Sequence, residues 1–307
     1  MVSTCMHELP QGIQLECRVS GQPGQALLLF LHGFPEGNFI WDELLSHFGQ
    51  HYRCVAPNLR GYGRSSQPAE VGDYRAKLLV DDLAALIALE SPGQPAACVI
   101  AHDWGGALAW GLANRHPDLI QRLMILNAPH PGAFLRELQS NPVQQAASQY
   151  MHFLRRPDAP ERLAENNWAR MLGFFAKADG QLPPWLTEAK QQQYRDHWNL
   201  GVHGACLFYA ASPLAPPKPG ASADDLHDIR GISLPAEMLS TPVPTRVLWG
   251  DSDPALQPSL LEGLQAWVPQ LQVQKLPGVS HWVLHEAAEA VRASLAEFLR
   301  DYGKVSC

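Results

Sequence analysis

The 307-residue sequence predicts an α/β fold in which a mostly parallel, doubly wound sheet carries an inserted helical cap. Apolar runs that suit buried strands alternate with helical segments between residues 13 and 126, the pattern of strands joined by crossover helices. The alternation stops at about residue 129 and resumes at about residue 243. We therefore predict a core of residues 1–128 and 243–307 and a cap of residues 129–242.

The first half of the core contains four apolar runs that are long enough for strands and too short for helices. They are residues 25–31, 52–56, 97–101 and 123–126. Between the second and third runs, residues 77–90 place Leu79, Leu83, Leu86 and Ile87 on one helical face, as expected of a helix that covers a sheet.

The cap region has helical segments rich in Trp, Phe, Tyr, Gln and Arg, interrupted by prolines. Its stretch 212–220 contains too many prolines for a helix and predicts a stiff, extended connection. After it the strand and helix pattern returns, with strands at 245–249 and 272–276 and helices at 259–268 and 286–302.

Composition narrows the class of function. The formal charge of −7, without a run of Lys or Arg, provides no surface for nucleic acid or an anionic membrane. No secretory signal and no membrane-spanning run is apparent, so the cytoplasm is the expected compartment. The six cysteines, at 5, 17, 54, 98, 206 and 307, lack the paired spacing of metal sites and are expected to be reduced thiols. The oligomeric state stays open, as either a monomer or a homodimer.

Asp103 follows the strand 97–101 in the run Ala101-His102-Asp103-Trp104-Gly105-Gly106 and precedes the helix 105–115. A sharp turn between a strand and a helix, with glycines just after it, is the setting of an activated nucleophile. A carboxylate in that position would form an ester with its substrate. The alternative is that Asp103 caps the helix, a common role for this residue.

His281 follows the last predicted strand, which places it at the carboxyl edge of the sheet with Asp103. The chain order of nucleophile, acid and histidine favours His281 as the general base, although an isolated histidine is more often a surface or core residue. The loop after strand 245–249 contains two candidates for the orienting acid. We choose Asp253, with Asp251 as the competitor.

The segment His32-Gly33-Phe34-Pro35 follows the first predicted strand of the parallel sheet. The backbone amides of Phe34 and Trp104 would face the oxyanion that forms when water attacks an ester carbonyl. We also assign His32, Pro35 and Trp104 to substrate binding. A simple turn at the end of a strand is the alternative for this segment.

Five segments together resemble the α/β-hydrolase-fold epoxide hydrolases. They are His32-Gly33-Phe34-Pro35-Glu36, the run from Asn58 to Ser66, His102-Asp103-Trp104-Gly105-Gly106, Asn127-Ala128-Pro129-His130-Pro131 and Gly278-Val279-Ser280-His281-Trp282. The resemblance spans nearly the whole chain. Its first and third segments are shared with haloalkane and haloacetate dehalogenases. Residues of the cap are therefore needed to distinguish an epoxide hydrolase from a dehalogenase.

The resemblance implies that two cap tyrosines protonate the epoxide oxygen, and Tyr150 and Tyr209 are similar to those two residues. A phenol suits this role because it stays protonated at neutral pH. Haloacetate dehalogenases carry arginines where this chain has Trp104 and Ala107, and a triad aspartate where it has Asn127. These departures count against a haloacid substrate.

The sequence thus predicts a hydrolase of ether bonds that converts an apolar epoxide and water to a vicinal diol, with no metal or organic cofactor. Asp103 would be the nucleophile, His281 the base, Asp253 its partner, and Tyr150 and Tyr209 the acids. The alternatives are a dehalogenase with the same nucleophile and a ligand-binding protein without turnover. The small-molecule substrate is its only predicted partner.

Overall fold

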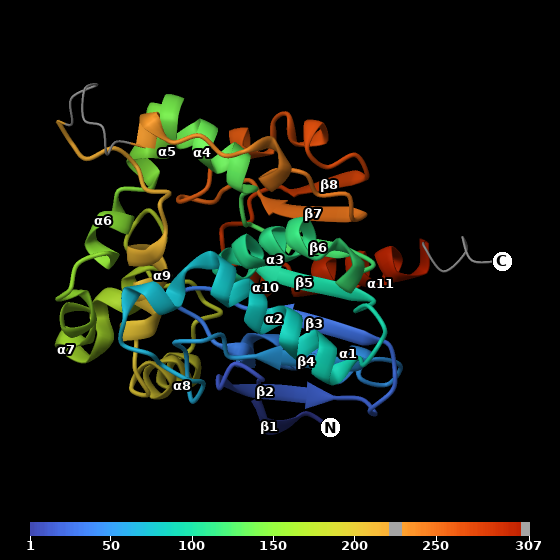
Figure 1. The fold of residues 1–307 in the computed structure, drawn as a ribbon. Helices are drawn as coiled ribbons and strands as arrows, with labels where there is room; N and C mark the ends of the chain where they lie inside the picture. The colour runs from blue at the N-terminus through green and yellow to red at the C-terminus, as the bar shows by residue number, and fades with distance from the viewer. Residues whose placement is uncertain (221–228, 302–307) are drawn as a thin grey trace.

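A single sheet forms the centre of the protein in this computed structural model, which describes residues 1–220 and 229–301 (Figure 1). The strand order is β1-β2-β4-β3-β5-β6-β7-β8. β2 is antiparallel to both β1 and β4, and every later pairing is parallel. The strands are β1 (Ser3–Glu8), β2 (Gln14–Ser20), β3 (Leu27–Leu31), β4 (Arg53–Pro57), β5 (Cys98–His102), β6 (Leu123–Leu126), β7 (Thr245–Gly250) and β8 (Leu271–Leu276).

Helices cover both faces of this sheet. Leu27, Leu29 and Leu31 of β3 pack in one apolar cluster with α2 (Ala76–Glu90) and α3 (Asp103–Arg115). Leu28 and Phe30 point the other way, into a second cluster with α1 (Asp42–Phe48) and α11 (Ala288–Asp301). Because both faces are covered, β3 is buried at every position and reads as a continuous apolar run.

The described chain between β6 and β7 is helical and irregular. Its longer helices are α4 (Pro131–Ser140), α5 (Pro142–Ala147), α6 (Tyr150–Leu154), α7 (Ala159–Gly173), α8 (Glu188–Trp198) and α9 (His203–Ala211). Figure 1 shows α6 to α9 beyond the carboxyl ends of the parallel strands, whereas α4 lies beside the part of the core that follows β7. Arg136 of α4 donates hydrogen bonds to the carbonyls of Ser259 and Glu262 there.

The predicted core strands agree with β3 to β8 within two residues at each end. The predicted helix 259–268 is wrong, because two short 3₁₀ helices, Pro258–Leu261 and Leu264–Ala266, are separated by Gly263 with φ of 72°. The predicted final helix 286–302 corresponds to α11, which begins at Ala288, and a separate short helix, α10 (Val283–Glu286), precedes it. The stretch 212–220 contains no helix, as predicted. Tyr302 and Cys307 lie outside the described residues.

The hairpin of β1 and β2 was not predicted. Side chains of β1 alternate between exposed and partly buried positions, so this edge strand lacks the apolar run that marks the central strands.

Within residues 1–220 and 229–301, no helix has the length and apolar character needed to cross a membrane.

Candidate active site

Asp103 lies at the sharp turn from β5 into α3. Its φ of 50° is in the left-handed region, where a residue other than glycine is uncommon. Gly105 is needed just after it, since a Cβ there would lie 2.5 Å from the carbonyl oxygens of Leu31 and His32. A Cβ on Gly106 would overlap Ala128 at the start of the loop after β6. The small residues thus let α3 approach the sheet closely enough to hold Asp103 at its carboxyl edge.

The Asp103 carboxylate is directed toward the loop after β3. Its Oδ1 accepts a hydrogen bond of 2.6 Å from the backbone N–H of Phe34. The residue at the N-cap position of helix α3 is His102, and its side chain makes no hydrogen bond to the first turn of the helix. This geometry favours a site role for Asp103 over the capping alternative.

The structure brings His281 between two carboxylates. Its Nε2 lies 3.7 Å from Oδ2 of Asp103, and its Nδ1 lies 2.6 Å from Oδ2 of Asp253. Oδ1 of Asp253 accepts hydrogen bonds from the backbone N–H groups of Ala255 and Leu256. These contacts hold the buried Asp253 carboxylate in one orientation, facing His281.

Asp251, the competing acid, lies elsewhere. It is exposed, and its Oδ1 accepts a hydrogen bond of 2.9 Å from the backbone N–H of Gly278. Asp251 therefore stabilises the loop before His281, while Asp253 is the carboxylate that contacts the imidazole.

The charges around His281 and Asp253 stabilise the imidazolium form of His281 and the carboxylate form of Asp253. Burial disfavours the His281 imidazolium, but the charge and hydrogen bond of Asp253, followed by the charge of Asp103, raise the pKa of His281 to about 9. Burial also works against the Asp253 carboxylate, yet His281 and the hydrogen bond from Asn127 hold its pKa below the usual value. The charge of Asp103 is thus one of the factors that set the basicity of His281.

The backbone amides of Phe34 and Trp104 are the two candidates for an oxyanion site near Asp103. The N–H of Phe34 already donates to Oδ1 of Asp103. Trp104 is the second residue of α3, where backbone amides have no partner within the helix. A Cβ on Gly33 would overlap the Asp103 carboxylate, so glycine is required for this close approach of the loop.

Tyr150 of α6 and Tyr209 of α9 converge above Asp103. Their ring centroids lie 6.1 Å apart, and the Tyr209 ring lies edge-on to Phe34 and Trp104 at 5.5 and 5.1 Å. Burial, and then nearby negative charge, raises the pKa of both phenols, so both are protonated at neutral pH. α6 and α9 therefore each place a protonated phenol near Asp103.

Two cavities meet at these residues, and both are lined by Asp103, Tyr150 and Tyr209. One, of about 90 Å³, is also lined by Trp104, Ala107, Pro129, Pro131, Phe134, Met151, Ser212, Leu214 and Leu256. The other, of about 250 Å³, is also lined by Phe34, Pro35, Ala147, Gly173, Phe174, Ala176, Pro254, Ala255, His281 and Trp282. Apart from the reacting groups, both linings are mainly apolar.

Of the three residues assigned to substrate binding, Pro35 and Trp104 line these cavities but His32 does not. The His32 side chain is fully buried; its Nε2 accepts a hydrogen bond from the N–H of Leu59, and its Nδ1 lies 3.1 Å from the carbonyl oxygen of Gly33. Burial lowers its pKa to about 3, so it is neutral. The assignment of His32 is therefore corrected: it braces the loop beneath the site, because both ring nitrogens face backbone groups.

Sequence reasoning missed a buried carboxylate behind the site. Glu36 lies 2.7 Å from Nε2 of His285 and 3.4 Å from Nδ1 of His102, and it accepts a hydrogen bond from the Tyr194 hydroxyl. Nε2 of His102 contacts the carbonyl oxygen of His281 at 2.9 Å. Despite burial, His285 and His102 hold the pKa of Glu36 well below its usual range. The sequence places Glu36 directly after Pro35, but no local pattern indicates its distant partners.

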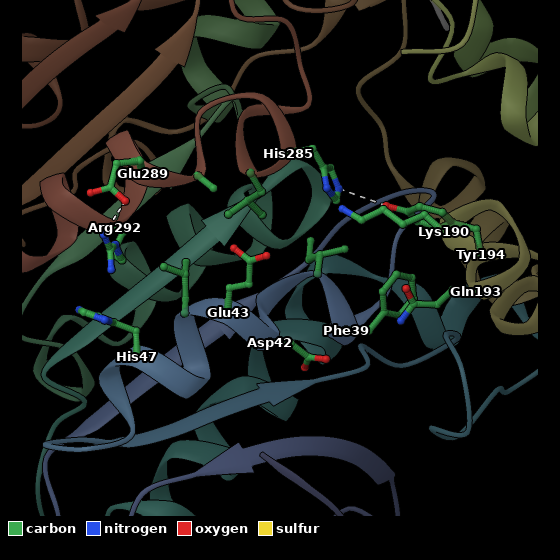
Figure 2. A pocket seen from close by; sticks show the side chains of 14 residues that line it. Phe39, Asp42, Glu43, His47, Lys190, Gln193, Tyr194, His285, Glu289 and Arg292 are labelled. Carbon is green, nitrogen blue, oxygen red and sulfur yellow. Dashed lines mark hydrogen bonds and ion pairs between the residues drawn. The ribbon is translucent and has the colours of Figure 1, made fainter. Parts of the chain in front are cut away.

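Figure 2 shows the outer side of this network, where the Tyr194 hydroxyl lies 3.1 Å from Nε2 of His285 and both residues line a separate cavity of about 490 Å³. Side chains of α1, α8 and α11 line it, and Asp103 is not among its lining residues. This larger cavity is thus distinct from the site around Asp103.

Comparison with known proteins shows the family to which the chain belongs. Residues 26–288 match the family model of the alpha/beta hydrolase fold. The chain is 32% identical to Epoxide hydrolase 3 of Xenopus tropicalis, over 94% of this chain and 76% of that protein. It is 30% identical to Epoxide hydrolase 1 of Caenorhabditis elegans, over 94% of this chain and 69% of that protein. The structure of a Bacillus megaterium epoxide hydrolase in complex with an inhibitor superposes with a TM-score of 0.84 at 29% identity, covering 96% of this chain and 99% of that chain. The chain therefore belongs to the epoxide hydrolase family of the α/β-hydrolase fold.

Proposed function

We propose that this protein hydrolyses an apolar epoxide to a vicinal diol through a covalent ester on Asp103. Membership of the epoxide hydrolase family supports the reaction class. The observation that carries the mechanism is the position of the Asp103 carboxylate. One of its oxygens is bound by the Phe34 amide and the other faces His281, at the meeting point of two cavities beneath Tyr150 and Tyr209.

In the first step, the free carboxylate oxygen of Asp103 attacks one epoxide carbon and the ring C–O bond breaks. Tyr150 or Tyr209 gives its hydroxyl proton to the leaving oxygen, which produces a hydroxyalkyl ester and a phenolate. The apolar walls of the two cavities hold the substituents of the epoxide, which orients its carbon toward the nucleophile.

In the second step, neutral His281 takes a proton from water, and the hydroxide attacks the carbonyl carbon of the ester. The amides of Phe34 and Trp104 stabilise the resulting oxyanion. The ester C–O bond breaks, and the leaving alkoxide takes the remaining proton of the attacking water from the Asp103 carboxyl group, so the diol leaves and Asp103 is again a carboxylate. The proton on His281 returns through solvent to the phenolate. One epoxide and one water give one diol.

The charge of the site changes in step with the reaction. Asp103 raises the pKa of His281 while it is a carboxylate, and an ester has no charge. Formation of the ester therefore lowers the pKa of His281 at the stage when it has to accept a proton.

The cap proposed here, residues 129–242, provides both tyrosines, and the core of residues 1–128 and 243–307 provides the nucleophile, the base and the amides. The activity thus depends on the packing of one part on the other.

The decisive experiment is the intact mass of a His281→Gln variant after separate exposure to styrene oxide and to a short bromoalkane. Without the base, the ester should accumulate, with a mass gain equal to the whole epoxide. A gain of the alkyl group without bromine would instead indicate a dehalogenase. No adduct with either compound would contradict covalent chemistry on these substrates and favour a protein without turnover.

The control is the double variant Asp103→Asn, His281→Gln. Because the neutral amide that replaces the Asp103 carboxylate lacks the nucleophilic oxygen, no adduct should form. An adduct of the same mass on the double variant would place the ester at another residue.

A further inference from the structure

Two cysteines face each other on the hairpin at the edge of the sheet. Cys5 of β1 is the register partner of Cys17 of β2, so both side chains lie on the same face. Directly opposite residues of an antiparallel pair have Cβ atoms about 4.5–5.5 Å apart, close to the roughly 3.5–4.5 Å of a disulfide. Cys5 is partly exposed, while the other cysteines among the described residues are buried, namely Cys17, Cys54, Cys98 and Cys206.

Cys5 lies beside a charged group of side chains. Its Sγ is 3.4 Å from Nε2 of His7, and that nitrogen is 2.7 Å from Oε1 of Glu90 at the end of α2. Arg53 donates to both oxygens of Glu90, at 2.7 and 3.0 Å. Hydrogen bonds that His7 donates to Cys5 and Glu90 raise the pKa of His7 to about 9, so it is an imidazolium at neutral pH.

Two cations lie close to the Cys5 sulfur. His7 and Arg53 both pair with the carboxylate of Glu90. The His7 imidazole contacts the Cys5 sulfur, and nearby cations are what activate cysteines in proteins. Burial raises the pKa of Cys17 well above its usual value, so Cys17 stays a thiol. The two sulfur atoms therefore have different surroundings, because Cys5 is partly exposed beside His7 and Cys17 is buried.

We propose that Cys5 and Cys17 form a peroxide-reactive thiol pair, a modification site separate from the hydrolase site. The Cys5 thiolate attacks one oxygen of a hydroperoxide and the O–O bond breaks. The leaving hydroxide or alkoxide takes the proton of His7, so Cys5 is oxidised to a sulfenic acid and the peroxide is reduced to water or an alcohol. Cys17 then attacks the sulfenic sulfur, the S–O bond breaks, and the Cys17 proton leaves with the hydroxide as water. The product is a disulfide between β1 and β2.

This pair is remote from the epoxide site. β2, β4 and β3 lie between β1 and β5, the strand that leads into Asp103. Oxidation of the cysteine pair and hydrolysis of an epoxide can therefore be measured independently, and epoxide turnover serves as a check on folding.

The test uses the purified full chain and hydrogen peroxide. We expect the protein to lose the mass of two hydrogen atoms, and peptide mapping should find one cross-linked peptide that joins Cys5 to Cys17. Cys17→Ser should stop at the sulfenic acid, which a dimedone label will locate at Cys5. Cys54→Ala, which removes a buried thiol outside the cluster, should react like the wild type.

His7→Gln removes the imidazolium and should slow oxidation of Cys5 about tenfold, the effect expected when a thiolate loses its cation. His7→Lys returns a positive charge to this position and should recover most of the rate. An unchanged rate in His7→Gln, or oxidation of Cys5 without a bond to Cys17 in the wild type, would overturn the proposal. Unchanged epoxide turnover in each variant will show that its fold is intact.

Discussion

Asn127 donates a hydrogen bond of 2.8 Å from Nδ2 to Oδ2 of Asp253, the same oxygen that contacts His281. Its side chain also bridges the end of β7, because Nδ2 donates to the carbonyl of Gly250 and Oδ1 accepts from the N–H of Gly250. Asn127 is fully buried and has φ of 35°, a conformation that asparagine tolerates better than most residues. It therefore fixes the position of Asp253, the carboxylate that contacts His281.

Asn127→Ala should lower the free energy of unfolding by about 1–3 kcal/mol, since buried polar groups of Asp253 and Gly250 lose their partner. Hydrolysis of the ester should also slow, because Asp253 is less firmly held. Denaturant unfolding and single-turnover kinetics measure the two effects. The control is Asn114→Ala, whose hydrogen bonds to Glu237 and Ser240 are exposed and should contribute less. Equal losses in both variants would contradict this role of Asn127.

Gly33→Ala should slow ester formation by about 100-fold, because its Cβ would overlap the Asp103 carboxylate and displace it. Gly72→Ala is the matched control, since an added Cβ there meets no atom within 4 Å. Rates of ester formation can be followed by rapid quench and mass spectrometry. A Gly33→Ala enzyme with the wild-type rate would show that the close approach of this loop is dispensable.

Replacing both Tyr150 and Tyr209 by Phe should slow ring opening by about 10²–10⁴-fold, the usual contribution of general acids, and should affect hydrolysis of the ester far less. Each single variant should keep part of the rate, because the other phenol remains in both cavities. Tyr52→Phe, a change in the loop before β4, controls for the loss of a phenol. If both steps slow equally, the acid role is wrong.

The stability of the fold should depend on pH through His281. Its pKa is about 9 in the folded protein and about 6.5 in an unfolded chain. A raised pKa stabilises the folded state fully below about pH 6.5, and this contribution is lost as the pH rises through 9. The size is on the order of 3 kcal/mol.

His281→Gln lacks this titration, so the wild type should lose stability relative to the variant between about pH 6.5 and 9. Denaturant unfolding of both proteins across this range measures the difference. A difference that stays constant with pH would contradict the raised pKa.

Much of the site could be predicted because its main residues have local signals. Asp103 lies between an apolar strand and a helix with two glycines, and His281 follows the last strand. In a parallel sheet, both positions fall at the carboxyl edge whatever the detailed path of the loops. Tyr150 and Tyr209 had no such signal, and only the resemblance to a family indicated them.

The sequence by itself determined the class of fold, since burial on both faces of a strand requires a continuous apolar run and burial on one face of a helix requires a period near 3.6 residues. Only the tertiary structure decided which side chains meet. It selects Asp253 over Asp251, places His32 beneath the site, and joins Glu36 to His102 and His285. The physical reason is that these contacts depend on strand order and loop path, which bring together residues distant along the chain and leave no periodic pattern in the sequence.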